Sequence, residues 1–289
     1  MKSRKWTEIV SNTIIYTVLT IMSVIWLVPI FWLVLQSFKL NDIGGSSGLS
    51  TSFFPATYTF NNYINLFVFN AADQVKFPLW FLNTFIVATI TCLISTILVL
   101  MTSYAFSRLD FKARKPMMKI ILILGMFPGF MTMIAIYHIL KLIGLTGSIW
   151  GLILVYSGGA AMGYYISKGF FDTIPKSIDE AAMIDGASKS QIFWQITLPL
   201  SKPIVIYTAL TSFIGPWGDF IFARLMLGDN LDSYTVARGL YWMITRENIQ
   251  TYFTRFCAGA VIIAIPITLL FIWMQKYYVS GVTGGSVKG

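Results

Sequence analysis

The sequence predicts an all-α, polytopic membrane protein with six transmembrane helices. Of its 289 residues, 56% are hydrophobic and only 11% are charged, and the mean hydropathy is +0.71. Soluble domains, by contrast, carry about a quarter charged residues. Six apolar stretches approach the length of about 20 residues that a helix needs to cross a hydrocarbon core. Each stretch is a continuous apolar run rather than an alternation, which favours helices over the strands of a membrane barrel.

The six stretches differ in regularity. The first is too long for a removable signal peptide and lacks a small-residue cleavage site, so we expect it to remain as a helix. The third contains Pro128 and Gly129, which indicate a kink. The fifth is interrupted by Pro203, Pro216 and Asp219. In chain order the stretches are residues 14–35, 79–101, 120–140, 149–166, 203–222 and 256–275.

Two long connections lie on the side of the membrane opposite the N-terminus. One joins the first two stretches and begins with a glycine- and serine-rich run at 44–48, which predicts a flexible start. The other covers residues 228–255. Both are rich in aromatic residues, which suits contact with a water-soluble partner; the alternative is that they only cap the helix bundle. We divide the chain into residues 1–76, a five-helix core at 77–276, and a tail at 277–289.

The basic residues predict the orientation. With six spans, about two-thirds of the 21 lysines and arginines fall on the side that holds both termini and the second-to-third and fourth-to-fifth connections. Both termini should therefore be cytoplasmic. Four arginines in the connection 223–255 are exceptions. The net charge of +9 suits this orientation and contact with anionic membrane lipid, and no basic-aromatic cluster indicates nucleic-acid binding.

A polar segment between the fourth and fifth spans, residues 168–202, says most about function; we call it the E-A-A segment. It contains E-A-A, then three residues, G, nine residues and I-x-L-P. The positions that we expect to matter are Glu180, Ala181, Ala182, Asp185, Gly186, Ile196, Leu198 and Pro199.

The first half of this pattern predicts a short helix that ends at a glycine. Pro175 discourages an earlier helical start. Ser177 and Glu180 have the spacing of a capping box, in which the hydroxyl and the acid satisfy backbone N–H groups. Gly186 most readily adopts the left-handed conformation that ends a helix.

The second half predicts another helix. Ser188 and Gln191 repeat the capping-box spacing, and Pro199 and Pro203 should stop the helix. The result would be a helix, a glycine turn and a second helix.

This arrangement indicates a docking surface. The small side chains of Ala181 and Ala182 would let another surface approach the backbone, and Phe193 and Trp194 would offer apolar area. A short helix with an apolar face outside the bilayer usually needs a cover. The alternative is an amphipathic loop that packs on its own chain.

The chain contains few of the residue patterns that form catalytic, metal or nucleotide sites. Its single histidine is His138, and Cys92 and Cys257 lack metal-type spacing, so we expect no metal site and no disulfide. The phosphate-cradling pattern G-x-x-x-x-G-K-[ST] is absent. We therefore expect no enzyme, no cofactor bound by this chain and no ATP hydrolysis by it.

One carboxylate, Asp219, falls within a predicted span, where a charge is costly and indicates function. Trp217 beside it could stack on a sugar ring, and Asn83 and Tyr164 could line the same substrate pathway. The alternative is that Asp219 caps a helix break or pairs with Arg224. A secondary transporter of a small polar solute would share this hydropathy, although it should show internal repeats and more charge within its spans.

The E-A-A pattern resembles the cytoplasmic loop by which permeases of ABC importers dock onto ATPase subunits. More narrowly, almost the whole chain resembles the shorter of the two permease subunits of carbohydrate importers of the maltose/maltodextrin type. Besides the E-A-A segment, the matching stretches are residues 104–108, 126–128, 168–171, 232–235, 264–268 and the glycine-rich tail 281–289.

That resemblance implies the type I ABC importer permease fold in a bacterial or archaeal cell membrane. The implied partners are a second homologous permease, two ATPase subunits that bind ATP and magnesium, and an extracytoplasmic sugar-binding protein. The tail would run between the ATPase subunits. The substrate would be an oligosaccharide, with monosaccharides, sugar alcohols and glycerol phosphate left open. In the maltose system the other permease holds most of the sugar, and a loop enters the cleft of the binding protein; here that loop corresponds to Ile244, Thr245, Arg246, Glu247 and Asn248.

Overall fold

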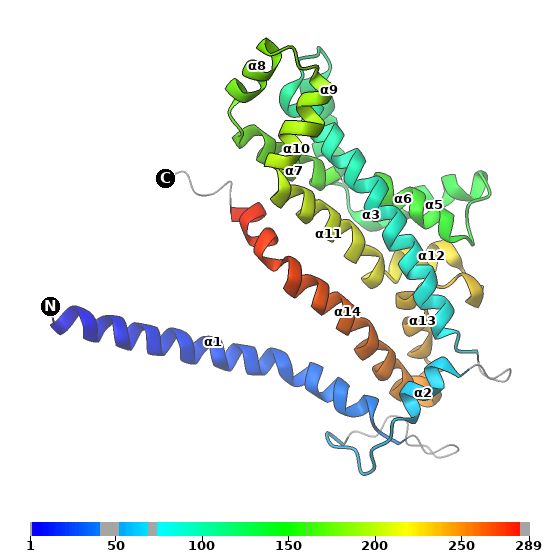
Figure 1. Cartoon of the computed structure of the whole chain (residues 1–289). Coiled ribbons are helices and arrows are strands. Elements are labelled where there is room, and N and C mark those ends of the chain that lie inside the picture. The colour runs from blue at the N-terminus through cyan, green and yellow to red at the C-terminus, as the bar shows by residue number, and fades with distance from the viewer. Residues whose placement is uncertain (1, 41–51, 69–73, 160, 284–289) are drawn as a thin grey trace. The chain divides into compact units, whose positions relative to one another are not determined.

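The computed structural model describes residues 2–40, 52–68, 74–159 and 161–283 (Figure 1). Within these residues the regular structure is helical, and one isolated antiparallel bridge joins Lys39 to Tyr58. This confirms the all-α prediction. The predicted flexible run at 44–48 lies outside the described residues, as does the tail from residue 284 onward.

The described chain contains helices of very different lengths. In chain order they are α1 Lys2–Ser37, α2 Asn61–Phe67, α3 Phe77–Arg108, α4 Arg114–Gly125, α5 Gly129–Leu142, α6 Ile149–Gly158, α7 Ala161–Thr173, α8 Lys176–Ile184, α9 Lys189–Gln191, a π-helical segment Ile192–Thr197, α10 Leu198–Leu200, α11 Lys202–Gly218, α12 Ile221–Leu227, a short 3₁₀ helix Leu231–Ser233, α13 Val236–Met243 and α14 Ile249–Thr283.

Four stretches of the described chain are long and apolar enough to cross a membrane, and the number rises to six if each of two bent helix pairs counts as one span. The bent pairs are α4 with α5, at 102°, and Lys189–Leu200 with α11, at 85°. The first bend lies at the predicted kink, where Pro128 has no N–H to continue the helix. The number therefore reaches the six predicted only when both bent pairs are counted as spans.

The chain divides into two compact units, which are described separately. The first contains residues 1–73 and 242–264, and the second contains residues 74–241 and 265–289. The three-part division made from the sequence is a different kind of boundary and remains a prediction.

In the first unit, Asn62 of α2 connects several segments. Its Nδ2 donates hydrogen bonds to the backbone oxygens of Ser37, at 2.9 Å, and Lys39, at 2.8 Å. Its Oδ1 accepts a hydrogen bond of 3.0 Å from the Thr254 hydroxyl. By contrast, apolar side chains of α1 between Ile9 and Phe31 are exposed around the helix, which suits lipid contact.

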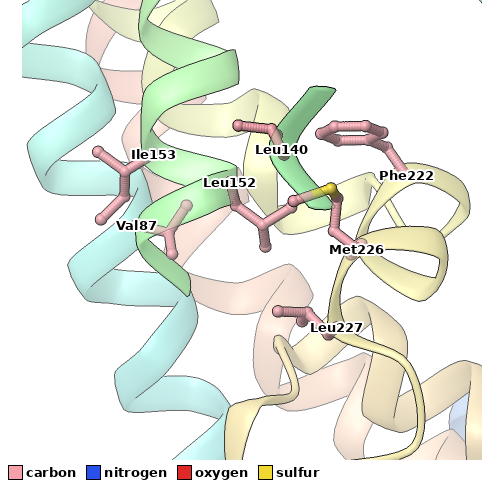
Figure 2. Packing of buried hydrophobic residues seen from close by; sticks show 8 residues of the cluster. Val87, Leu140, Leu152, Ile153, Phe222, Met226 and Leu227 are labelled. Carbon is pink, nitrogen blue, oxygen red and sulfur yellow. The ribbon is translucent and has the colours of Figure 1, made fainter. Parts of the chain in front are cut away.

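In the second unit, α3 is the central helix and packs against α6, α7 and α11. One apolar cluster lies where α3, α5, α6 and α12 meet, and Figure 2 shows Leu152 and Met226 at its centre. A second cluster gathers Leu100 and Tyr104 of α3 with residues of α7, α11 and the π-helical segment. These two clusters hold α3 near its middle and near its C-terminal end.

Candidate functional site

The first helix of the E-A-A segment is α8, which begins directly after Pro175. The predicted cap by Ser177 is wrong, because the helix starts one residue before Ser177 and places it inside the first turn. The predicted end is confirmed. Gly186 has φ +85°, its N–H donates to Met183 O at 3.1 Å, and the Ala187 N–H donates to Ala182 O at 2.9 Å. This pair of bonds is the Schellman arrangement that closes a helix.

The second helix begins with the predicted capping box. Ser188 Oγ accepts from the Gln191 N–H at 3.3 Å, and Gln191 Oε1 accepts from the Ser188 N–H at 2.8 Å. The helix then widens into the π-helical segment, where the Leu198 N–H donates to Phe193 O, five residues back. Pro199 lies inside the final turn rather than ending it, and the helix ends at Leu200.

The two faces of α8 differ sharply. Asp179 and Ala182 are buried, whereas Glu180, Ala181 and Asp185 are exposed. Two apolar neighbours that the sequence reasoning did not single out also face outward: Met183 is 47% exposed and Ile184 is 87% exposed. Asp179 and Ala182 are three residues apart and so share one face of the helix, but the sequence does not mark the charged Asp179 as buried.

The π-helical segment presents a different face from the one predicted. Phe193 is buried in the second apolar cluster, with its ring centroid 4.9 Å from that of Tyr104. It is therefore not free to offer apolar area to a partner, and that part of the prediction is wrong. Trp194 is 50% exposed and Pro199 is exposed, while Ile196 and Leu198 are half-buried. Figure 1 shows α8 and α9 beside the C-terminal end of α3.

A cavity of about 610 Å³ lies within the second unit, between α3, α5, α6, α7, α11 and α12. Its lining includes the carboxylate of Asp219. Asp219 Oδ1 accepts from the Phe222 N–H at 3.0 Å, and Oδ2 accepts from the Tyr156 hydroxyl at 2.9 Å. The lining residues that carry hydroxyl groups are Thr91, Ser95, Thr132, Tyr156, Tyr207, Thr211 and Ser212.

These bonds give Asp219 a structural role. It lies in the break between α11 and α12 and caps the first turn of α12, as one alternative from the sequence predicted. Its other suggested partner, Arg224, instead donates to the Tyr241 hydroxyl at 3.0 Å.

The other residues predicted for the substrate pathway lie elsewhere. Trp217 is buried, with its ring centroid 5.1 Å from that of Phe81, and it is not on the lining of this cavity. Tyr164 borders a separate small recess. The structure thus brings Asp219, but not Trp217 or Tyr164, to the cavity.

Asn83 anchors a loop at the N-terminal end of α3. Its Nδ2 donates to Asp232 O at 2.8 Å and to Tyr234 O at 3.0 Å. Arg238 completes this anchor, because its Nη2 donates to the Tyr234 hydroxyl at 2.9 Å. Burial raises the pKa of the Tyr234 hydroxyl and lowers the pKa of the Arg238 guanidinium. Asn83 is thus committed to the loop and does not line the cavity.

The residues predicted to contact a binding protein form the tight turn between α13 and α14. Asn248 Nδ2 donates to Trp242 O at 3.0 Å and to Thr245 Oγ1 at 3.1 Å, so the turn is held by its own side chains. Arg246 and Glu247 are exposed at its tip, and Ile244 is half-buried. The connection predicted at 228–255 is mostly helical. In the described residues, no group of three or more His, Cys, Asp or Glu side chains could hold a metal ion.

A family model described as "Binding-protein-dependent transport system inner membrane component" matches residues 99–284, which include the E-A-A segment and the cavity-lining helices α5, α6, α7, α11 and α12. The chain belongs to this family. As a multi-pass inner membrane component, this permease has the apolar helices that its family requires.

Curated relatives match the permease along nearly its whole length. The galactooligosaccharides transport system permease protein GanQ of Bacillus subtilis is 38% identical over 290 residues, covering 100% of this chain and 99% of that protein. The maltodextrin transport system permease protein MalD of Streptococcus pneumoniae is 34% identical over 281 residues, covering 96% of each.

A solved structure shares the fold. It is the crystal structure of a bacterial ABC transporter involved in the import of the acidic polysaccharide alginate, and one of its chains matches the permease with a TM-score of 0.74 at 21% identity. The match covers 93% of this chain and 96% of that chain. The predicted ABC importer permease fold is thereby confirmed.

Proposed function

We propose that the permease is one of two membrane subunits of an ATP-driven importer for an oligosaccharide. Its relatives GanQ, MalD and MdxG are named as permeases for galactooligosaccharides or maltodextrins and are 34% to 38% identical to it. The secondary-transporter alternative loses its support, because the family is described by its dependence on a binding protein.

The observation that carries the proposal is the outward face of α8. Ile184 is 87% exposed on a polar segment that lies between apolar stretches, and the rest of the described chain leaves it uncovered. An exposed apolar side chain beside Met183 and Glu180 suits the cleft of a soluble protein better than water. We assign that cleft to an ATPase subunit, with ATP and magnesium bound there and not on this chain.

The remaining partners are a second homologous permease, a second ATPase subunit and an extracytoplasmic sugar-binding protein. In this proposal the tip of the 244–248 turn contacts the binding protein, and the glycine-rich tail 281–289 reaches the ATPase subunits. The cavity beside Asp219 forms part of this subunit's half of the translocation pathway. Its hydroxyl groups can donate and accept hydrogen bonds, as a passing sugar requires.

The cycle is alternating access. ATP binding closes the ATPase dimer, the α8 helices of the two permeases approach each other, and the helix bundles change from inward-facing to outward-facing. Energy enters only if α8 makes different contacts with the two ATPase states.

Charge changes on the outward face of α8 test the docking site. Glu180→Lys and Ile184→Asp should each abolish co-purification of the ATPase subunit with the tagged permease, because both changes place a mismatched charge in the contact. Asp110→Lys is the matched control, since its side chain is 98% exposed and outside the E-A-A segment. Retention of the ATPase by both α8 variants would place the docking site elsewhere.

Cysteine labelling tests the orientation in the same cells. Lys189→Cys should react with an impermeant maleimide only after the cells are opened, whereas Glu247→Cys should react in intact cells. Both side chains are exposed. The reverse pattern would place the E-A-A segment outside the cell and overturn the proposal.

A further inference from the structure

Arg108, the last residue of α3, lies at the centre of a buried polar junction. Its Nη2 donates to Phe171 O at 2.9 Å and to Ile174 O at 2.8 Å, at the C-terminal end of α7. Its Nε lies 3.4 Å from Asp179 Oδ2 of α8, and the side chains of Arg108 and Asp179 are 4% and 12% exposed. One guanidinium therefore joins three helices, and its charge also suits the carbonyl end of α7.

The neighbouring residue strengthens the junction between α3 and α7. Ser107 Oγ donates to Asp172 Oδ1 at 2.6 Å, and Asp172 also pairs with Lys168. Asp179 is the one residue of the junction that belongs to α8. The ion pair between Arg108 and Asp179 thus links α8 to α3.

The α3 helix also lines the cavity. Thr91 and Ser95 of α3 line the cavity, and they lie about three to five turns of the same helix from Arg108. The α3 helix runs unbroken from Phe77 to Arg108, so a displacement of its C-terminal end moves the cavity wall. On α8, Asp179 faces inward, while the proposed docking residues Glu180 and Ile184 face outward.

We propose that Arg108 and Asp179 are positioning residues that transmit movement of α8 to α3 and so to the wall of the translocation pathway. This inference rests on the proposed function, because it requires an ATPase that docks on α8. Breaking a buried ion pair by removing one charge leaves the other uncompensated. The link would then loosen while the outward face of α8 stays intact.

The test separates docking from coupling. Asp179→Asn and Arg108→Gln are each assembled with the ATPase subunits and binding protein in proteoliposomes, and both ATP hydrolysis and sugar uptake are measured. Each variant should retain the ATPase subunit and hydrolyse ATP, but should carry about tenfold less sugar per ATP, within the range typical of coupling between two protein sites. A role in stability alone would lower assembly and hydrolysis together and leave this ratio unchanged.

The double variant Arg108→Gln with Asp179→Asn decides whether the two residues act as a pair. It removes both charges and leaves no unpaired ion, so it should fold even if a single variant does not. Its uptake per ATP should fall by about tenfold, no further than that of either single variant, whereas independent residues would give the product of the two losses. Asp110→Asn, which removes an exposed carboxylate from its pair with Arg114, should behave as wild type.

The outcomes are distinct. Loss of ATPase retention by Glu180→Lys together with wild-type uptake per ATP in both junction variants would overturn this inference and leave the proposed function standing. If the loss of uptake per ATP in the double variant equals the product of the two single losses, this inference is also overturned. If the wild-type permease binds no ATPase, the proposed function itself fails.

Discussion

Gly186 illustrates how one backbone conformation shapes the E-A-A segment. Its φ of +85° is in the left-handed region, and a Cβ atom at this position would meet nothing within 4 Å. Glycine is therefore favoured at position 186 because of the backbone conformation, and not because a larger side chain would clash. Asparagine tolerates this conformation, whereas β-branched residues rarely adopt it.

This difference gives a prediction at the scale of one residue. Gly186→Asn should retain the ATPase subunit, and Gly186→Val should lose it, because valine destabilises the turn by roughly 1–2 kcal/mol and turns α8 away from α9. Quantified co-purification of the two variants, with permease yield as the control, measures the effect. Equal retention by both would mean that the turn does not position α8.

At the scale of an element, the π-helical segment shows why one face was misassigned. The extra residue in its turn shifts the helical phase by about 100°. The sequence prediction exposed both Phe193 and Trp194, and it is wrong for Phe193 only. The sequence carries no clear signal for the shift except the missing N–H of Pro199. The Ser177 cap was wrong for a different reason, because Pro175 itself occupies the cap position and the helix begins at Lys176.

The two aromatic residues of this segment should separate stability from docking. Phe193→Ala should lower the free energy of unfolding by about 3–5 kcal/mol, because it empties part of the buried cluster around Tyr104. Trp194→Ala, with its side chain half exposed, should change stability by about 0.5 kcal/mol or less and weaken ATPase retention. Thermal denaturation in detergent and co-purification measure the two effects. The opposite ranking in stability would contradict the assigned burial.

At the scale of the whole molecule, hydropathy alone predicted the six apolar stretches, and Pro128 and Asp219 marked two of their interruptions. The E-A-A pattern indicated the family by its resemblance to the loop of ABC importer permeases. Its spacing separately predicted the glycine turn and the capped second helix. The cavity could not be predicted, because it depends on how α3, α5 and α11 pack, and no local pattern records that packing. For the same reason Asn83 and Trp217 looked like pathway residues, whereas one holds a loop and the other is buried among aromatic rings.

Asp219 connects the fold to the proposed pathway, and two substitutions distinguish its roles. Asp219→Asn keeps an acceptor for the Phe222 N–H, so uptake should remain within about threefold of wild type. Asp219→Leu removes the cap and should lower the free energy of unfolding by about 0.5–2 kcal/mol, with a larger loss of uptake. If Asp219→Asn abolishes uptake in a fully assembled transporter, the charge itself acts on the sugar.

The two-faced character of α8 also bears on how such importers diversify. Because Asp179 and Ala182 secure one side of this helix to its own chain, the other side can change without disturbing the fold. A few substitutions at Glu180, Met183 and Ile184 would then suffice for duplicated importers to bind different ATPase subunits, or for several importers to bind the same one.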